Sequence, residues 1–271
     1  MFCNICNHST SYLFTKKILR KYDVKYFKCT KCDFIQTEYP HWLNEAYSNA
    51  ITNLDLGLVK RNIYFSNLTE RLLLKFFDYD KPHLDYAGGY GLFVRLMRDK
   101  GFNFYRQDKY CENIFSKHFD INDTSTSHFE VLTAFEVFEH LVKPVEELNT
   151  MLKNADNVIF STEITPNNIV NDWWYFSPET GQHISFYSIK SLEILAKYHG
   201  LFYYTNGINM HLFTKKQHKK NPFKTSVFDI KYRVLPFIER IYTKYNHKVN
   251  RIKIHSKLEE DYNYIKDESS F

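Results

Sequence analysis

The chain has 271 residues, of which 44% are hydrophobic and 25% are charged, so it can bury a sizeable core and is neither disordered nor fibrous. Only eight Gly and seven Pro are present, which excludes collagen-like and linker-rich architectures. The net charge of +5 is localised, because residues 215–257 hold 13 Lys and Arg against two Asp and Glu, whereas residues 1–214 hold 22 against 24.

The hydropathy pattern predicts a protein without a transmembrane segment. No stretch approaches 18 uncharged apolar residues, which is the length that a membrane-spanning helix requires. The first residues also lack the basic-then-apolar order of a secretory signal. We therefore expect a soluble, cytoplasmic protein.

Four of the five cysteines form two pairs with metal-ligand spacing: Cys3, Cys6, Cys29 and Cys32. Two thiolates separated by two residues converge from one tight turn, and two such turns complete the tetrahedral shell of Zn²⁺. Four protein ligands leave no open position, so we expect a structural zinc in a ribbon module spanning residues 1–40. Two disulfides are the alternative, which a reducing compartment disfavours. The lone Cys111 is expected to be a core residue.

The middle of the chain alternates between strand and helix patterns. Residues 41–81 read as a helical connector, with apolar residues at helical spacing over Glu45–Asp80. Residues 82–214 predict a Rossmann-like α/β domain, with a mostly parallel sheet and helices on both faces. The predicted strands are Leu84–Ala87, Phe102–Tyr105, Phe129–Ala134, Asn157–Ser161, Phe202–Asn206 and Met210–Thr214, and the predicted helices are Leu92–Lys100, Val145–Lys153 and Ser188–His199.

Residues 215–271 form a C-terminal extension that carries the positive charge. Apolar residues recur at helical spacing from Val234 to Ile252, which predicts a long amphipathic helix. Its Lys and Arg residues indicate either a well-solvated helix or a surface for an acidic partner such as nucleic acid.

A glycine-rich turn lies between the first predicted strand and helix of the α/β domain, with Ala87, Gly89 and Gly91 at alternate positions. Such a turn lets the backbone approach a ligand closely, and the helix N-terminus offers free N–H groups. Asp108 follows the next strand, where a carboxylate can bind both hydroxyls of a ribose. Asp85 precedes the turn, in a position that suits a cofactor carrying an ammonium or sulfonium group. These residues indicate S-adenosylmethionine.

With these residues the sequence resembles the class I S-adenosylmethionine-dependent methyltransferases, in which an acidic strand end leads into a Gly-x-Gly-x-Gly loop. Ala87 stands where that loop has its first glycine. The block from Phe129 to His140 looks like the family's fourth strand followed by a Glu-His pair. The resemblance implies that Asp85, Ala87, Gly89, Gly91, Asp108 and Ala134 bind the cofactor.

A third block, from Trp173 to Ser188, looks like the substrate loop of a bacterial subgroup that modifies sugars and polysaccharides, some members of which carry a four-cysteine zinc module. A hydroxyl acceptor must lose its proton during transfer, and His is the usual base. His140 and His183 are both candidates, because His140 follows a strand end and His183 lies in the aromatic loop. Glu139 is expected to be structural.

Three functions therefore remain open at the level of sequence. The first is methyl transfer to a small molecule, with oxygen of a sugar, sugar nucleotide or polysaccharide precursor as the expected acceptor and carbon or nitrogen as alternatives. The second is methylation of an RNA base, with the ribbon and residues 215–257 binding the RNA. The third is a non-catalytic zinc-containing interaction protein. The acceptor and the oligomeric state are not indicated by the sequence.

Overall fold

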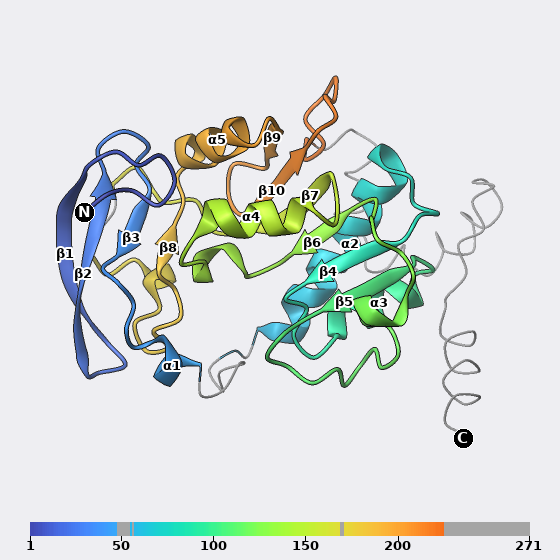
Figure 1. Cartoon of the computed structure of the whole chain (residues 1–271), viewed down its shortest axis with the longest axis horizontal. Coiled ribbons are helices and arrows are strands. Elements are labelled where there is room, and N and C mark those ends of the chain that lie inside the picture. The colour runs from blue at the N-terminus through green and yellow to red at the C-terminus, as the bar shows by residue number, and fades with distance from the viewer. Residues whose placement is uncertain (48–54, 56, 169–170, 225–271) are drawn as a thin grey trace, which may run out of the picture.

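Two β-sheets organise the chain (Figure 1). The structure is a computed structural model that describes residues 1–47, 55, 57–168 and 171–224. Within these residues there is a four-stranded N-terminal sheet and a six-stranded central sheet. No helix among the described residues is long and apolar enough to span a bilayer. The predicted C-terminal helix lies outside the described residues.

The central sheet confirms the predicted Rossmann-like fold. Its strand order is β5-β4-β6-β7-β10-β9, with the first four strands parallel and β10 antiparallel to both of its neighbours. The strands are β4 (His83–Tyr86), β5 (Phe104–Gln107), β6 (Leu132–Ala134), β7 (Asn157–Ser161), β9 (Phe202–Thr205) and β10 (Met210–Thr214).

Helices cover both faces of this sheet, because its strands are apolar on both sides. On β7, Val158 and Phe160 pack with α4 (Pro144–Leu152) and α5 (Ile189–Tyr198). The intervening Ile159 packs on the opposite face with α2 (Leu58–Phe76) and α3 (Leu92–Asp99). The alternation of side chains along a strand thus produces two cores from one continuous apolar run.

The N-terminal sheet is antiparallel and combines residues from two distant parts of the chain. β1 (Thr10–Ile18), β2 (Tyr22–Cys29) and β3 (Ile35–Thr37) come from the predicted zinc ribbon. The fourth strand, β8 (Ser185–Phe186), belongs to the predicted α/β domain and lies beside β3 (Figure 1). The short helix α1 (Leu43–Ala46) follows β3, and we define residues 1–46, which include α1, as the N-terminal module.

Some predicted elements differ from those observed. The described helices of the connector are α1 and α2, so the observed helix over Glu45–Asp80 is shorter than expected. The strand predicted at Phe102–Tyr105 begins at Phe104, because Gly101 has a φ of +93° and Phe102 N–H bonds to Met97 O to close α3. The strand predicted from Phe129 begins at Leu132, with Phe129 in an isolated bridge to Ala155. Short 3₁₀ helices lie at Ile121–Asp123, Phe138–His140 and Trp174–Phe176.

Candidate functional site

A cavity of about 1050 Å³ lies beyond the carboxyl ends of β4, β5 and β6. This is where ligands bind in open α/β sheets. Its volume is at the upper end of the range for small-molecule sites, so it has room for a cofactor and an acceptor together. One side is formed by the glycine turn and the residues after β5, and the other by the 136–143 and 174–183 segments and by residues before and within α2.

The glycine turn leaves no room for side chains at two positions. A Cβ on Gly88 would lie 2.5 Å from Asp85 Oδ2, because the turn folds back over the end of β4. Gly91 has a φ of +87° and caps α3, and a Cβ there would collide with the Ser116 hydroxyl. No side chain caps α3, so its first N–H groups are free to bind an anionic group of a ligand.

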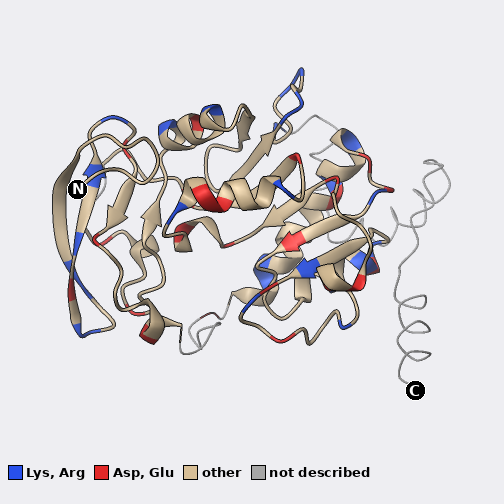
Figure 2. Cartoon of the chain, in the orientation of Figure 1, with Lys and Arg blue, Asp and Glu red and all other residues tan. Residues whose placement is uncertain are grey.

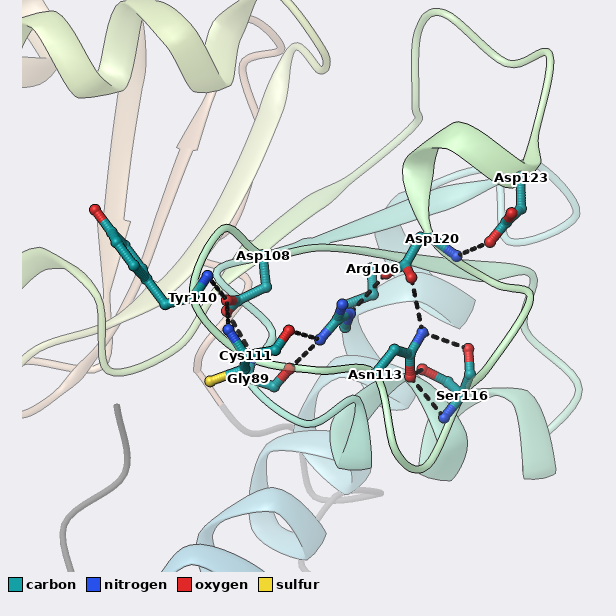
Figure 3. A network of polar contacts seen from close by, with 9 residues as sticks. All are labelled: Gly89, Arg106, Asp108, Tyr110, Cys111, Asn113, Ser116, Asp120 and Asp123. Carbon is teal, nitrogen blue, oxygen red and sulfur yellow. Dashed lines mark hydrogen bonds and ion pairs between the residues drawn. The ribbon is translucent and has the colours of Figure 1, made fainter. Parts of the chain in front are cut away.

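Asp108 is held at the cavity by three backbone N–H groups (Figure 3). Its Oδ2 accepts a hydrogen bond from Gly89 N at 2.9 Å, and its Oδ1 accepts from Tyr110 N at 2.8 Å and Cys111 N at 2.7 Å. A carboxylate has about four acceptor sites in all, so one site, on Oδ2, remains for hydrogen bonding to the ribose hydroxyls. The carboxylate therefore connects the glycine turn to the turn after β5.

Arg106 also belongs to this site, although it was not identified from the sequence. Its nearly buried guanidinium bonds to Asp120 Oδ1 at 2.6 Å and donates to the backbone oxygens of Gly89 and Cys111 (Figure 3). It thereby joins the same two turns that Asp108 joins. A charged residue inside a short buried strand was the available signal, since a buried guanidinium needs partners.

Asp85 lies next to Arg106 in the register of β4 and β5, where an acidic and a basic segment adjoin (Figure 2). Its Oδ1 accepts a hydrogen bond from Thr133 Oγ1 at 2.6 Å. Burial raises the pKa of Asp85 to about 7, against the opposing effect of Thr133 and Arg106. A cationic ligand would restore the ionised form, because opposite charge favours it.

Of the predicted cofactor residues, some lie on the cavity wall and others lie behind it. Ala87 and Gly89 line the cavity together with Asp85 and Asp108. Gly91 is buried behind the wall, where it packs against Ser116. Ala134 is fully buried at the end of β6 and is outside the cavity wall, which Phe135 and Glu136 form instead.

His140 and His183 both line the far side of the cavity, with ring centroids 5.0 Å apart. His140 Nδ1 lies 3.0 Å from Gln182 O and 2.9 Å from the Tyr47 hydroxyl, and His183 Nδ1 lies 2.7 Å from Tyr175 O. A carbonyl oxygen only accepts, so each Nδ1 carries the proton and each Nε2 keeps a lone pair. Burial lowers the pKa of His140 to about 3 and that of His183 to about 4, so both are neutral near pH 7.

Carboxylates surround these histidines. Glu139 is fully buried, and burial followed by the charge of Glu136 raises its pKa well above the usual range. Glu136 has a φ of +56° and lies 3.5 Å from Arg61, which also bonds to Asp55 at 2.7 Å. Non-glycine residues with such a φ cluster at functional sites. Arg61 was not identified from the sequence, because its contact with Glu136 joins two distant parts of the chain.

The four paired cysteines converge as the sequence predicts. Cys3 and Cys32 have Sγ atoms 3.5 Å apart, as have Cys6 and Cys29, and one ligand atom from each of the four lies within 4.8 Å of the others. A Zn–S bond of about 2.3 Å places tetrahedral thiolates about 3.8 Å apart, so the cluster fits a zinc ion. The backbone N–H groups of Ile5 and Lys31 also donate to Cys3 and Cys29 sulfur. None of the five thiols forms a disulfide.

Residues 60–205 match the protein family described as Methyltransferase domain. Similar solved structures include CalO1, a methyltransferase of calicheamicin biosynthesis, with 13% identity and a TM-score of 0.40. The alignment covers 64% of the present chain and 61% of the CalO1 chain. The plantazolicin methyltransferase BpumL has 10% identity and a TM-score of 0.40, and the alignment covers 65% of the present chain and 95% of the BpumL chain. A methyltransferase of Thermotoga maritima has 12% identity and a TM-score of 0.42, with 66% and 98% covered. No curated protein matches the sequence.

Replacing Asp108 with Asn should weaken binding of S-adenosylhomocysteine by about 1.5–3 kcal/mol, roughly 10- to 150-fold in Kd, since a charged hydrogen-bond acceptor is lost. Isothermal titration calorimetry measures this. Asp123→Asn is the matched control, because Asp123 also accepts a backbone N–H, from Asp120, but lies outside the cavity wall. Equal affinity of the two variants would remove the ribose assignment.

Binding of S-adenosylmethionine should tighten as the pH rises from about 6 to about 8, because Asp85 ionises near pH 7 and the ion attracts the cationic ligand. Asp85→Asn should abolish this dependence. The pKa of Asp85 is higher in the folded protein than in the unfolded chain, so folding favours the protonated carboxyl. The free energy of unfolding should therefore fall as the pH rises from about 4 to about 7, and Asp85→Asn should remove this fall as well. A pH dependence that survives in the variant contradicts the assignment.

Ala87 has a φ of +53°, which costs an L-residue about 1–2 kcal/mol. Ala87→Gly should therefore raise the free energy of unfolding by about 0.5–1 kcal/mol, after the added flexibility of the unfolded chain is subtracted. Denaturant unfolding measures the change. Ala196→Gly in α5 should instead lower stability by about 1 kcal/mol, and a loss of similar size at Ala87 would refute the strain.

Proposed function

The chain belongs to the family described as Methyltransferase domain, and we propose that it acts as a class I S-adenosylmethionine-dependent methyltransferase on a small polar acceptor, expected to be a hydroxyl of a sugar, sugar nucleotide or polysaccharide precursor. One observation carries this proposal. The cavity has Gly89 and Asp108 on one side and two neutral histidines with free Nε2 lone pairs on the other. The first side suits a nucleoside and the second suits an acceptor that must lose a proton.

On the cofactor side we assign Asp85, Ala87, Gly89 and Asp108 to direct binding, with Gly91 and Ala134 shaping the turn and the strand end behind the wall. S-adenosylmethionine supplies an electrophilic methyl group on a sulfonium. Asp85 in its ionised form and the free N–H groups of α3 would bind the ammonium and carboxylate of the amino-acid part. Arg106 keeps the two turns fixed, so little reorganisation accompanies binding.

On the acceptor side, His140 or His183 would accept the proton through Nε2 as the new bond forms. Burial keeps both rings neutral near pH 7 and so leaves the Nε2 lone pairs available. The same burial disfavours the imidazolium, so a neighbouring negative charge must stabilise the ring that accepts the proton. The backbone oxygens of Gln182 and Tyr175 hold the tautomers. Alignment of the acceptor with the methyl group then accounts for much of the rate.

The charge of the cavity favours a neutral or cationic acceptor over an anionic one, so within the proposed class it favours a sugar over a sugar nucleotide, and it disfavours a nucleic acid. Seven acidic residues line it against three Lys and Arg. Arg61 is paired with two carboxylates, and Lys143 with Glu146, so these cations are already neutralised. Trp174 is 70% exposed at the cavity and Tyr110 is 83% exposed, and their flat faces suit stacking on a sugar ring.

We assign the four-cysteine site to a structural zinc ion, held by Cys3, Cys6, Cys29 and Cys32, and a cytoplasmic location to the protein, because thiolate ligands require reducing conditions. In this proposal the zinc stabilises residues 1–40, residues 41–81 connect, and residues 82–214 carry the catalytic site. Residues 215–271 form a basic extension whose partner is left to experiment.

The acceptor class can be tested with methyl-labelled S-adenosylmethionine offered in parallel to free sugars, nucleotide sugars and total RNA. Transfer to a sugar-type acceptor supports the proposal. Transfer to RNA alone would overturn the small-molecule assignment, and it should then weaken steeply with salt, because phosphate contacts release counterions.

His140→Ala and His183→Ala test the base, with turnover measured beside S-adenosylhomocysteine affinity. Loss of the base should lower kcat by about 10²–10⁴-fold while cofactor affinity survives. His128→Ala controls for loss of a histidine at a distant, half-exposed position. Full turnover of both cavity variants would exclude a catalytic role for either residue.

A further inference from the structure

The segment that carries His183, residues 175–188, packs against the N-terminal module and pairs with its sheet. Ile35 of β3 pairs with Phe186, and Gln36 pairs with Ser185. One residue before this ladder, Ile184 O accepts a hydrogen bond from Thr37 N at 3.1 Å. His183 is thus immediately adjacent to a strand of the module's own sheet.

The module and this segment also share one hydrophobic core. It combines Ile18, Val24, Tyr26, Ile35, Trp42 and Ala46 of the module with Tyr175, Phe176, Ile184 and Phe186. Tyr26 and Phe176 have ring centroids 5.2 Å apart and are both essentially buried. Neither side could bury these aromatic surfaces alone, so the two must order together.

The carbonyl groups that fix both histidine rings come from this same segment. Tyr175 O faces His183 Nδ1, and Gln182 O faces His140 Nδ1. Gln182 is itself tied to the module, since its Nε2 donates to Ala46 O at 2.9 Å. The orientation of each imidazole therefore depends on residues that pack against or bond to the module.

A short series of contacts connects this segment to the cysteine cluster. The buried Gln36 side chain accepts from Asn4 N at 2.8 Å and donates to Phe2 O at 3.0 Å, on either side of Cys3. At the other end, Ser188 Oγ donates to Cys32 O at 2.7 Å. Both cysteine-bearing turns are thus bonded to the β3–β8 pair or to the residues that flank it.

Gly181 lies at a close contact between the segment and the module. Its φ is +65°, and a Cβ would lie 2.8 Å from Ile18 Cγ2 and 3.3 Å from Trp42 Cδ1. Gly181 O accepts a hydrogen bond from Trp42 Nε1 at 2.8 Å. A methyl group here would push the segment away from the module.

We propose that the N-terminal module is the positioning element of the acceptor side: through Gln36, Trp42 and Gly181 it holds the backbone oxygens that orient His183 and His140, and an intact cysteine cluster is required for this. The inference rests on the proposed function for the role of the two histidines. Trp42, Gly181 and Gln36 are positioning residues, whereas the cofactor side is held independently by Asp108 and Arg106.

The first test compares Gly181→Ala with Gly200→Ala in the full chain. Gly200 has nearly the same φ, +67°, but nothing lies within 4 Å of its added Cβ, so both variants carry the backbone strain and only one displaces the segment. Amide hydrogen exchange at residues 182–187 should rise about tenfold or more in Gly181→Ala only. The Kd of S-adenosylhomocysteine should stay within about twofold in both. Equal exchange in the two variants would overturn the proposal.

The second test removes the metal from the wild-type protein with a chelator and follows ¹⁵N-histidine NMR spectra. The ring N–H signals of His140 and His183 should be lost. His211, whose Nε2 lies 2.9 Å from Thr162 O in the central sheet, is the internal control and should keep its signal. This arm decides the matter even if Gly181→Ala does not fold.

The outcomes separate the two proposals. Retained His140 and His183 signals after complete metal loss contradict the positioning role, as does simultaneous loss of the His211 signal, which would indicate general unfolding. Failure of the metal-loaded wild type to bind S-adenosylhomocysteine would instead refute the proposed function. Selective loss at the two cavity histidines with unchanged cofactor affinity supports the inference.

Discussion

The antiparallel pairing of β3 with β8 is the contact on which the acceptor side of the cavity depends. It brings residues from the start of the chain against a two-residue strand that begins two residues after His183. A two-residue strand has too few hydrogen bonds to be stable alone. It is ordered because the same residues belong to a shared aromatic core and because the cysteine turns are bonded to both ends of the pair. The module is therefore part of the catalytic domain's architecture rather than an appendage.

The cofactor side depends on a different constraint, the requirement that buried charge be paired. Arg106 lies within β5 and Asp108 follows its end, and both bind the same two turns, one through carbonyl oxygens and one through N–H groups. The turn geometry is therefore determined before any ligand arrives. Asp85 is a group whose charge can respond to a cationic ligand, because burial raises its pKa to about 7.

Local sequence patterns predicted most of the helices and strands and the glycine turn, whereas contacts between distant residues could not be predicted from them. Three features could be identified as candidates from short, characteristic spacings in the sequence: the Gly89–Gly91 turn, Asp108 and the four cysteines. Arg61 and Tyr47 were missed because Glu136 and His140 lie far from them in the sequence. Arg106 was missed because its role depends on how two turns come together in the fold. β8 has no periodicity to detect, and Gly181 is meaningful only beside Trp42. Ala134 was assigned from its place in a motif, yet its side chain is buried behind the wall.

The central claim is that a single cavity joins a nucleoside site at Asp108 to an acceptor site at His140 and His183. A crystal structure of the complex with S-adenosylhomocysteine measures this most directly. The account predicts ribose hydroxyls on the Asp108 carboxylate and a thioether sulfur directed at the space in front of the two histidine Nε2 atoms. A ligand bound with its sulfur facing away from both rings, or outside this cavity, would contradict it.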